Sequence, residues 1–149
     1  MLGSAGTVRA NRAFVGDEDF LVCYADNLTD ANLSALQSVH TAHDVPLTMG
    51  LFETGRPEEC GIAALDPGGR ITAFTEKPEK PVSNLANAGI YVASADLFDV
   101  IPEDRTPVDF GFDVIPKLVG RMAGCRIEGF LMDIGTPERY AEAQRRWPY

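Results

Sequence analysis

A short apolar run that ends at an aspartate, within residues 20–30 (FLVCYADNLTD), constrains the fold more than any other feature of the sequence. The run predicts a buried strand from Phe20 to Ala25, and the polar residues after it predict a turn into a helix. Such a strand would deliver Asp26 to its carboxyl end. In open α/β sheets, ligands bind just outside the carboxyl ends of the strands.

Residues 129–140 (GFLMDIGTPERY) repeat this arrangement near the other end of the chain. Apolar residues lead into Asp133, and Thr136 followed by Pro137 predicts a capped helix start. Mg²⁺ is usually held by one or two carboxylates, with phosphate oxygens and water as its other ligands. Asp26 and Asp133 together therefore predict a Mg²⁺ site that serves a phosphate substrate, whereas either aspartate alone could be an ordinary turn residue.

The remaining pattern alternates strands with helices and predicts one domain, residues 1–149, of the α/β class. Residues 1–12 are expected to form a loop that runs into a short helix. Further strands are expected at 46–53, 60–65, 70–76, 87–92 and 126–132, and helices at 31–42, 95–100, 113–119 and from 137 onward. Asp30 and Ser94 are the expected N-caps of the first two helices. The turn Asp66-Pro67-Gly68-Gly69 predicts a β-hairpin, so we expect a mixed sheet with flanking helices.

Composition excludes several classes of function. The formal charge is −9 and the basic residues are scattered, which argues against a nucleic-acid partner. No apolar run approaches the ~20 residues that cross a bilayer. Cys23, Cys60 and Cys125 are odd in number, far apart and set among apolar neighbours, which predicts reduced, buried thiols in a cytoplasmic protein.

Smaller motifs allow two interpretations each. Glu76-Lys77 in FTEKP is either a solvated ion pair or a group that binds sugar hydroxyls and a phosphate. Gly89, inside the strand NAGIYV, is a residue type that often marks close approach of a ligand or of another backbone. His40 and His43 have the i, i+3 spacing of a metal pair, but a helix face with a helix-end histidine is the favoured interpretation.

Six segments, taken in order, carry a family resemblance: LGSAG (2–6), YADNLTD (24–30), FTEKP (74–78), NAGIYV (87–92, with Asn87 first), DFGFDVIP (109–116) and DIGTPERY (133–140). Together they resemble the sugar-1-phosphate nucleotidyltransferases, or nucleotide-sugar pyrophosphorylases, and most of all the mannose-1-phosphate guanylyltransferase-like proteins. The resemblance implies a Rossmann-like fold. It also implies transfer of a nucleoside monophosphate from a nucleoside triphosphate to a sugar 1-phosphate, which gives a nucleotide sugar and pyrophosphate.

The resemblance further implies a role for each matching residue. Asp26 and Asp133 would ligate Mg²⁺, Lys77 would bind the sugar phosphate and Glu76 the sugar hydroxyls. The nucleotide base would be bordered by Gly3, Ser4, Ala5 and Gly6. The sugar ring would lie against Gly61, and the sugar pocket would be lined by Asn87 and Gly89. GTP is the favoured nucleotide, while the other bases and the identity of the sugar stay open.

The chain departs from the family pattern at its start. Met1 stands just before LGSAG, so the sequence resembles the C-terminal two-thirds of the family domain and lacks the N-terminal signature loop, whose arginine and lysine wrap the triphosphate. We therefore expect little turnover from this chain alone, and a homo-oligomer that covers exposed sheet edges. The alternatives are a non-catalytic sugar-phosphate-binding or regulatory subunit, and a shortened gene product.

Overall fold

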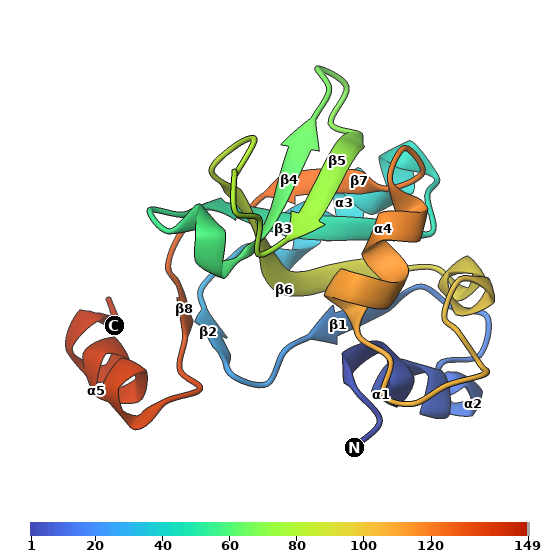
Figure 1. Ribbon diagram of the computed structural model, residues 1–149, viewed down its shortest axis with the longest axis horizontal. Helices are drawn as coiled ribbons and strands as arrows, with labels where there is room; N and C mark the ends of the chain where they lie inside the picture. The colour runs from blue at the N-terminus through green and yellow to red at the C-terminus, as the bar shows by residue number, and fades with distance from the viewer. Residues whose placement is uncertain (149) are drawn as a thin grey trace.

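A mixed six-stranded sheet forms the centre of the protein. The computed structural model describes residues 1–148 (Figure 1). Five strands lie in the order β5-β4-β6-β3-β7, and β1 pairs with the free part of β6. Their bounds are β1 Phe20–Cys23, β3 Leu47–Glu53, β4 Gly61–Leu65, β5 Ile71–Glu76, β6 Leu85–Ala93 and β7 Ala123–Arg126. β7 runs parallel to β3, whereas the other pairs are antiparallel, which confirms the predicted mixed α/β sheet with its hairpin.

A separate two-stranded sheet joins the two aspartate segments. β2 (Asn27–Thr29) pairs antiparallel with β8 (Leu131–Asp133), and Asn27 stands opposite Asp133. The predicted single strand at 126–132 is wrong, because the chain leaves the main sheet after β7 and turns at Gly129, whose φ of 109° is in the left-handed region. Asp30 stabilises this turn by accepting a hydrogen bond from the Phe130 amide at 2.6 Å.

The helices begin close to the predicted positions but differ in detail. Their bounds are α1 Ser4–Ala10, α2 Arg12–Val15, α3 Leu33–His43, α4 Ile115–Leu118 and α5 Pro137–Arg146, with short 3₁₀ turns at Pro57–Glu59 (η1) and Ala95–Asp99 (η2). Asn32, not the expected Asp30, caps α3 through its side-chain oxygen, since Asp30 is engaged with Phe130. Thr136 caps α5 as predicted.

The segment predicted as a helix over 113–119 starts earlier and more loosely. A single π-helical turn, Phe110–Val114 (η3), precedes α4, and the Asp109 side chain caps it by accepting from the Gly111 and Phe112 amides. Pro116 lies in the first turn of α4, where a missing amide hydrogen costs nothing.

Two apolar clusters cover the two faces of β6. On one face Tyr91, fully buried, stacks on Phe110 with ring centroids 5.2 Å apart, and α1, η3 and α4 pack around them. On the other face Ile90 and Val92 pack against Leu36 of α3. Successive residues of a strand point to opposite faces, so this single strand organises both halves of the core.

The cysteines differ from expectation in one respect. All three are free thiols, but Cys23 is exposed and Cys60 and Cys125 are only half-buried, so the prediction of buried thiols is wrong. Cys23 alternates with inward-facing residues on β1, an edge strand with one open face. Within residues 1–148, no helix has the length and apolar composition needed to cross a membrane.

The two histidines of α3 make separate structural contacts. His40 is buried and its Nδ1 lies 2.9 Å from Thr48 Oγ1. His43 Nε2 lies 2.8 Å from the Gly68 carbonyl and Nδ1 lies 2.9 Å from the Val39 carbonyl. Carbonyl oxygens only accept, so both bonds form together only when both ring nitrogens of His43 carry a proton. These two bonds, that to Gly68 first, raise the pKa of His43.

We expect the substitution His43→Gln to lower stability more at low pH than at high pH. A pKa raised in the folded state stabilises fully below the unfolded value of about 6.5, and this contribution is lost as pH rises through the folded pKa. The difference should stay below about 1 kcal/mol, because the site is close to solvent. Urea unfolding at pH 5.5 and pH 8.5 measures it, and an equal loss at both pH values would contradict the assignment.

Candidate functional site

A cavity of about 780 Å³ opens between the main sheet and the β2–β8 pair. Residues from β4, β5, β6, β8, α5 and the turn before η3 line it. Seven of the residues singled out from the sequence meet in this cavity: Asp26, Gly61, Glu76, Lys77, Asn87, Gly89 and Asp133. They come from segments more than 100 positions apart in the chain, so the fold gathers them at one place.

Asp26 and Asp133 converge because of the β2–β8 pair. The Ile134 amide donates to the Asp26 carbonyl at 2.7 Å, which fastens the two strand ends together. A Cβ atom added to Gly135 would lie 3.0 Å from Asp133 Oδ1 and 3.1 Å from Asp26 Oδ2. Both carboxylates therefore border one small volume, and glycine at 135 keeps that volume open.

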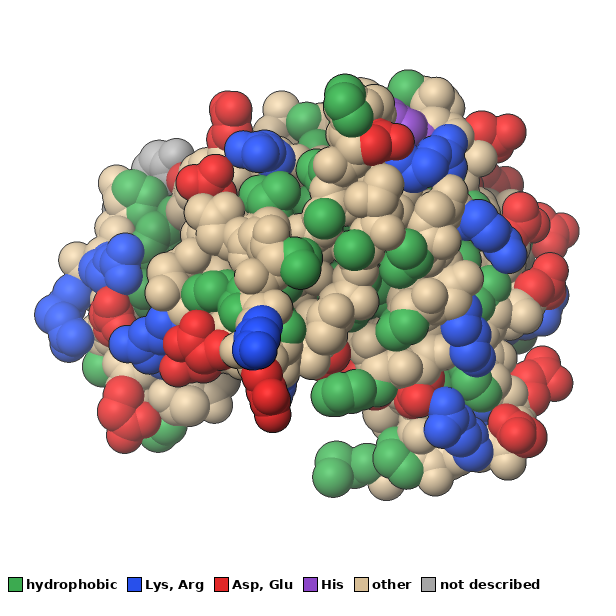
Figure 2. All heavy atoms as spheres, turned by 45° about the horizontal axis from the view of Figure 1, so that its top comes forward, with side chains coloured by type: hydrophobic (Ala, Val, Ile, Leu, Met, Phe, Trp, Pro, Cys, Tyr) green, Lys and Arg blue, Asp and Glu red, His purple; other side chains and the backbone are tan. Residues whose placement is uncertain are grey.

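Asp133 has two further partners. Its Oδ1 accepts from the Gly135 amide at 2.7 Å, and its Oδ2 lies 3.1 Å from Arg139 Nη1 on α5. Acidic and basic side chains alternate at the left of Figure 2, the end of the molecule at which Figure 1 shows α5. In the part of the chain that the structure describes, no group of three or more His, Cys, Asp or Glu could hold a metal ion. A cation here would have two carboxylates and would need further oxygens from a ligand.

Glu76 is the last residue of β5, Lys77 follows it, and both line the same cavity. A Cβ on Gly61 or on Gly111 would lie 2.5 Å from Glu76 Oε2, so two glycine backbones hold this carboxylate between them. Burial is the largest influence on the pKa of Glu76 and raises it; the positive charge of Lys77 lowers the pKa, and the negative charge of Asp109 raises it by a smaller amount. Lys77 has a φ of 46°, a left-handed conformation that is uncommon for a residue with a side chain. Residues in such conformations are often found at functional sites.

Asn87 and Gly89 form the floor beside Tyr24. The Asn87 Oδ1 atom accepts from the Gly89 amide at 2.9 Å, and Nδ2 donates to the Tyr91 hydroxyl at 2.7 Å. A Cβ on Gly89 would lie 2.7 Å from the Tyr24 ring and 2.8 Å from Asn27 Nδ2. The close approach expected at this glycine is made by the protein itself.

The LGSAG segment lies beside this cavity and not in it. Ser4 lines a second hollow of about 780 Å³ between α1, α2 and β1, and Tyr24 and Asp26 border both hollows. Gly3 is required by its φ of 80° and by the Val108 backbone packed against it. Ala5 and Gly6 are buried in the interior, and of the four residues Ser4 alone lines either of these two cavities.

Sequence reasoning missed several residues that line the first cavity, chief among them Tyr24, Asp109, Gly111 and Arg139. Asp109 and Gly111 belong to the DFGFDVIP segment, which the sequence marked as a motif without a role. Arg139 belongs to DIGTPERY, where only the aspartate had been assigned. The missed residues therefore lie inside motifs that the sequence analysis marked, and membership of those motifs is the signal that could have found them.

Comparison with known proteins decides the family. The family model described as Nucleotidyl transferase matches residues 1–148. The chain belongs to this nucleotidyltransferase family. Its relatives agree with the sugar-1-phosphate branch that the sequence motifs indicate.

Three curated relatives show the range of that branch. The chain is 32% identical to the low-salt glycan biosynthesis nucleotidyltransferase Agl11 of Haloferax volcanii over 97% of its length. It is 35% identical over 95% to a glucose-1-phosphate adenylyltransferase of Thermotoga maritima, and 31% identical over 93% to a mannose-1-phosphate guanylyltransferase of Mycobacterium tuberculosis. The chain spans only 42%, 37% and 40% of the lengths of these relatives.

A solved structure supports the fold. A Bacillus anthracis protein assigned as a glucose-1-phosphate thymidylyltransferase, crystallised in complex with a sucrose, superposes with a TM-score of 0.80 at 23% identity. The match covers 96% of this chain and 60% of the other. The Rossmann-like mixed sheet predicted from the sequence is thereby confirmed.

Proposed function

We propose that this chain forms one nucleotidyltransferase-like unit that transfers a nucleoside monophosphate from a nucleoside triphosphate to a sugar 1-phosphate. The observation that carries the proposal is the convergence of Asp26 and Asp133 in a cavity that Glu76 and Lys77 also line. Family membership and the activities for which the relatives are named support the same reaction.

In this reaction a phosphate oxygen of the sugar 1-phosphate attacks the α-phosphorus in line. The bond from that phosphorus to the bridging oxygen breaks, and pyrophosphate leaves with the electron pair. Lys77 would hold the attacking phosphate as a point charge, and Glu76 would accept hydrogen bonds from sugar hydroxyls. The attacking phosphate is already ionised, so the site needs no general base, and catalysis depends on positioning and charge stabilisation.

The donor set at Asp26 and Asp133 fits a divalent cation. Both side chains supply hard oxygens that border one volume, and phosphate oxygens would complete the shell, as is usual for Mg²⁺. Bound there, Mg²⁺ would supply neutralisation of the phosphate charge. Arg139, now paired with Asp133, is close enough to contribute a second positive charge.

The finer assignments belong to the same proposal. GTP is the favoured nucleotide because the LGSAG segment, whose Ser4 lines the same hollow as Asp26, resembles the base-binding segment of the guanylyltransferases. The three free thiols support a cytoplasmic location, where cysteines stay reduced.

Lys77→Met should weaken binding of a sugar 1-phosphate by about tenfold or more, since a charge-assisted hydrogen bond is worth roughly 1.5–3 kcal/mol. Calorimetry with mannose 1-phosphate, glucose 1-phosphate and Mg²⁺-GTP measures it. The control is Lys80→Met, which removes a lysine three positions away that does not line the cavity. No binding of any of these ligands would refute the proposal, and sugar phosphate binding without nucleotide would identify a non-catalytic binding module.

Gly135→Ala should weaken cation binding by roughly 10–100-fold, the usual effect of disturbing the surroundings of metal ligands. The added methyl group would enter the volume that the two carboxylates share. Mn²⁺ titration followed by electron paramagnetic resonance measures the affinity. Gly55→Ala is the control, because Gly55 also lines the cavity but has no atom within 4 Å of an added Cβ. Equal Mn²⁺ affinity in both variants would place the cation elsewhere.

We also propose that two copies associate through the face formed by β1 and α2. Among the described residues β1 pairs only with β6, and Phe14 and Leu21 beside its open edge are 92% and 48% exposed. Edge strands with apolar neighbours pair readily with another chain. Sedimentation should show a dimer that Phe14→Glu dissociates and Val82→Glu, a change at an exposed valine in the loop before β6, does not. A wild-type monomer at high concentration would exclude this association.

A further inference from the structure

Helix α5 presents one charged face to the cavity that Asp26 and Asp133 line. Arg139, Glu142 and Arg146 all line this cavity, and they stand three and four positions apart in the chain. Residues with this spacing lie on the same face of a helix. Figure 1 shows α5 beside β8 and apart from the other helices. This helix therefore brings two arginines and one glutamate to the cation end of the cavity.

The two arginines have different partners. Arg146 Nη1 lies 2.8 Å from Glu142 Oε1 on the same helix, whereas Arg139 Nη1 lies 3.1 Å from Asp133 Oδ2. The other oxygen of Asp133, Oδ1, accepts from the Gly135 amide and borders the volume that the two aspartates share. Arg139 thus contacts one oxygen of a carboxylate whose other oxygen faces the proposed cation site.

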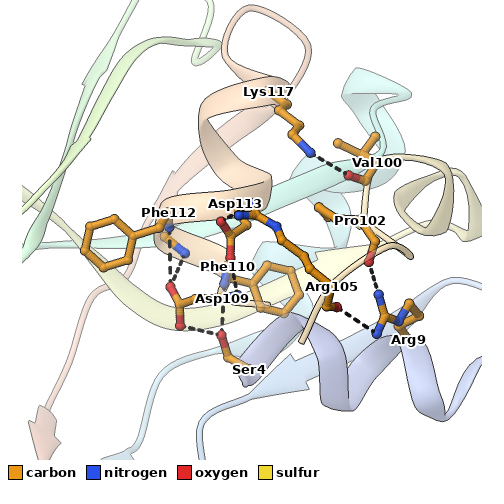
Figure 3. A network of polar contacts seen from close by, with 11 residues as sticks. Ser4, Arg9, Val100, Pro102, Arg105, Asp109, Phe110, Phe112, Asp113 and Lys117 are labelled. Carbon is orange, nitrogen blue, oxygen red and sulfur yellow. Dashed lines mark hydrogen bonds and ion pairs between the residues drawn. The ribbon is translucent and has the colours of Figure 1, made fainter. Parts of the chain in front are cut away.

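An aspartate held by an arginine and by a backbone amide can have a structural role only. Asp113 is an example, because it accepts from Arg105 through Oδ1 and from the Asp109 amide through Oδ2 at 2.7 Å (Figure 3). Asp113 does not line the cavity. Asp133 differs from it because the carboxylate of Asp26 borders the same small volume. An arginine on Asp133 therefore acts on a pair of carboxylates, not on a single one.

Neither stability nor helix formation accounts for an arginine at position 139. The side chains of Arg139 and Asp133 are 45% and 49% exposed, and exposed ion pairs contribute little to stability. Arg139 is also the residue whose amide donates to the capping hydroxyl of Thr136 at 3.2 Å. Glutamate or glutamine is favoured at this place in a helix start, and the helix dipole disfavours a positive charge there. The guanidinium therefore faces the cavity against the local preference of the helix.

The balance of charge shows how Arg139 affects a cation at this site. Asp26 and Asp133 carry two negative charges, which one divalent cation would neutralise. The guanidinium of Arg139 is always charged, so the site with a cation would have an excess of one positive charge. Like charges repel and opposite charges attract, so this excess disfavours a free cation and favours a cation that arrives with phosphate.

The exposure of the ion pair also leaves Arg139 able to change its partner. Once the charge of Asp133 is neutralised, the ion pair weakens and the guanidinium becomes available at small cost. Its planar set of N–H donors matches the oxygens of a phosphate group. Phosphate oxygens are also the ligands that would complete the shell of a Mg²⁺ ion held by two carboxylates.

We propose that Arg139 makes this site select a cation–phosphate complex over a free cation. While paired with Asp133, Arg139 weakens the binding of a free divalent ion, and after release it donates to an oxygen of the phosphate. The inference rests on the proposed function and deepens it, because it names the residue that favours joint binding of the two ligands. The phosphate can belong to the nucleotide or to the sugar 1-phosphate, and the experiment separates these sources.

Arg139→Met tests the first half of the proposal, because it removes the charge and keeps a long side chain that suits a helix. We expect Mn²⁺ alone to bind this variant about three- to tenfold more tightly than the wild type, the scale of one charge contact near solvent. Electron paramagnetic resonance measures the free Mn²⁺. Arg139→Lys keeps the charge and should stay within about twofold of the wild type. A misfolded variant would lose Mn²⁺ affinity, so a gain cannot be mistaken for misfolding.

The binding of phosphate ligands should change in the opposite direction. Calorimetry at saturating Mg²⁺ measures the affinity for mannose 1-phosphate, glucose 1-phosphate and GTP. At least one of them should bind Arg139→Met about tenfold more weakly, the effect of losing one charge-assisted hydrogen bond. A loss confined to the sugar phosphates places Arg139 at the sugar phosphate, and a loss confined to GTP places it at the nucleotide phosphates.

Arg146→Met is the matched control, because Arg146 lines the same cavity from the same helix face but pairs with Glu142. Its affinities should stay within about twofold of the wild type. Equal changes in both methionine variants would overturn the inference, since the effect would then come from the overall charge of the cavity. Weaker or unchanged Mn²⁺ binding in Arg139→Met would also overturn it, because Arg139 would then only hold Asp133 in place. Unchanged affinity for every phosphate ligand would do the same.

The wild-type protein tests the proposed function separately. If it binds no phosphate ligand at saturating Mg²⁺, the proposed function fails and the inference fails with it. If it binds both Mn²⁺ and a phosphate ligand while Arg139→Met behaves like the wild type, the proposed function stands and the inference alone fails.

Discussion

The three-residue pairing of β2 with β8 is the contact on which the candidate site depends. It sets Asn27 opposite Asp133 and brings the Asp26 carbonyl to the Ile134 amide. Without this pairing the two aspartates would belong to the ends of unrelated segments. A register shift of one residue would turn each side chain to the other face of the pair, so the site requires this alignment and no neighbouring one.

The pairing is held in place at its other end by Asp30. That side chain accepts from the Phe130 amide, and the Thr29 hydroxyl donates to the Phe130 carbonyl at 2.8 Å. The Asp30 side chain thus contacts a residue 100 positions away in the chain, and Asn32 caps α3 in its place. The preference for aspartate at helix N-caps favoured Asp30, but its side chain is engaged in a tertiary contact that the sequence does not show. The same turn split the strand expected at 126–132.

What the sequence could reveal was therefore the local part of the structure. Apolar periodicity located the strands around residues 47–53, 61–65, 71–76 and 85–93 and the hairpin turn between the middle two, because these depend on neighbours in the chain. It could not reveal that β1 lies at an edge, which is why Cys23 was expected to be buried. Nor could it reveal the contact of Ser4 with Asp109, because two separate segments must be packed before those side chains meet. The motifs DFGFDVIP and LGSAG were visible as strings, but only the fold shows that Ser4 of one is bonded to Asp109 of the other.

Glycines explain how so many charged groups fit around one cavity. Gly61 and Gly111 lie on either side of Glu76, and Gly135 lies between Asp26 and Asp133. At each position a Cβ would come within about 3 Å of a carboxylate oxygen, so a larger residue would push the charge away from its place. These glycines act by leaving room, which is a different requirement from the turn geometry that usually selects glycine. The backbone of these glycines therefore flanks the acidic groups and holds them in place. The carboxylates are thus oriented before a ligand binds. A site prepared in this way loses less side-chain freedom on binding, which favours affinity for a small, highly charged substrate.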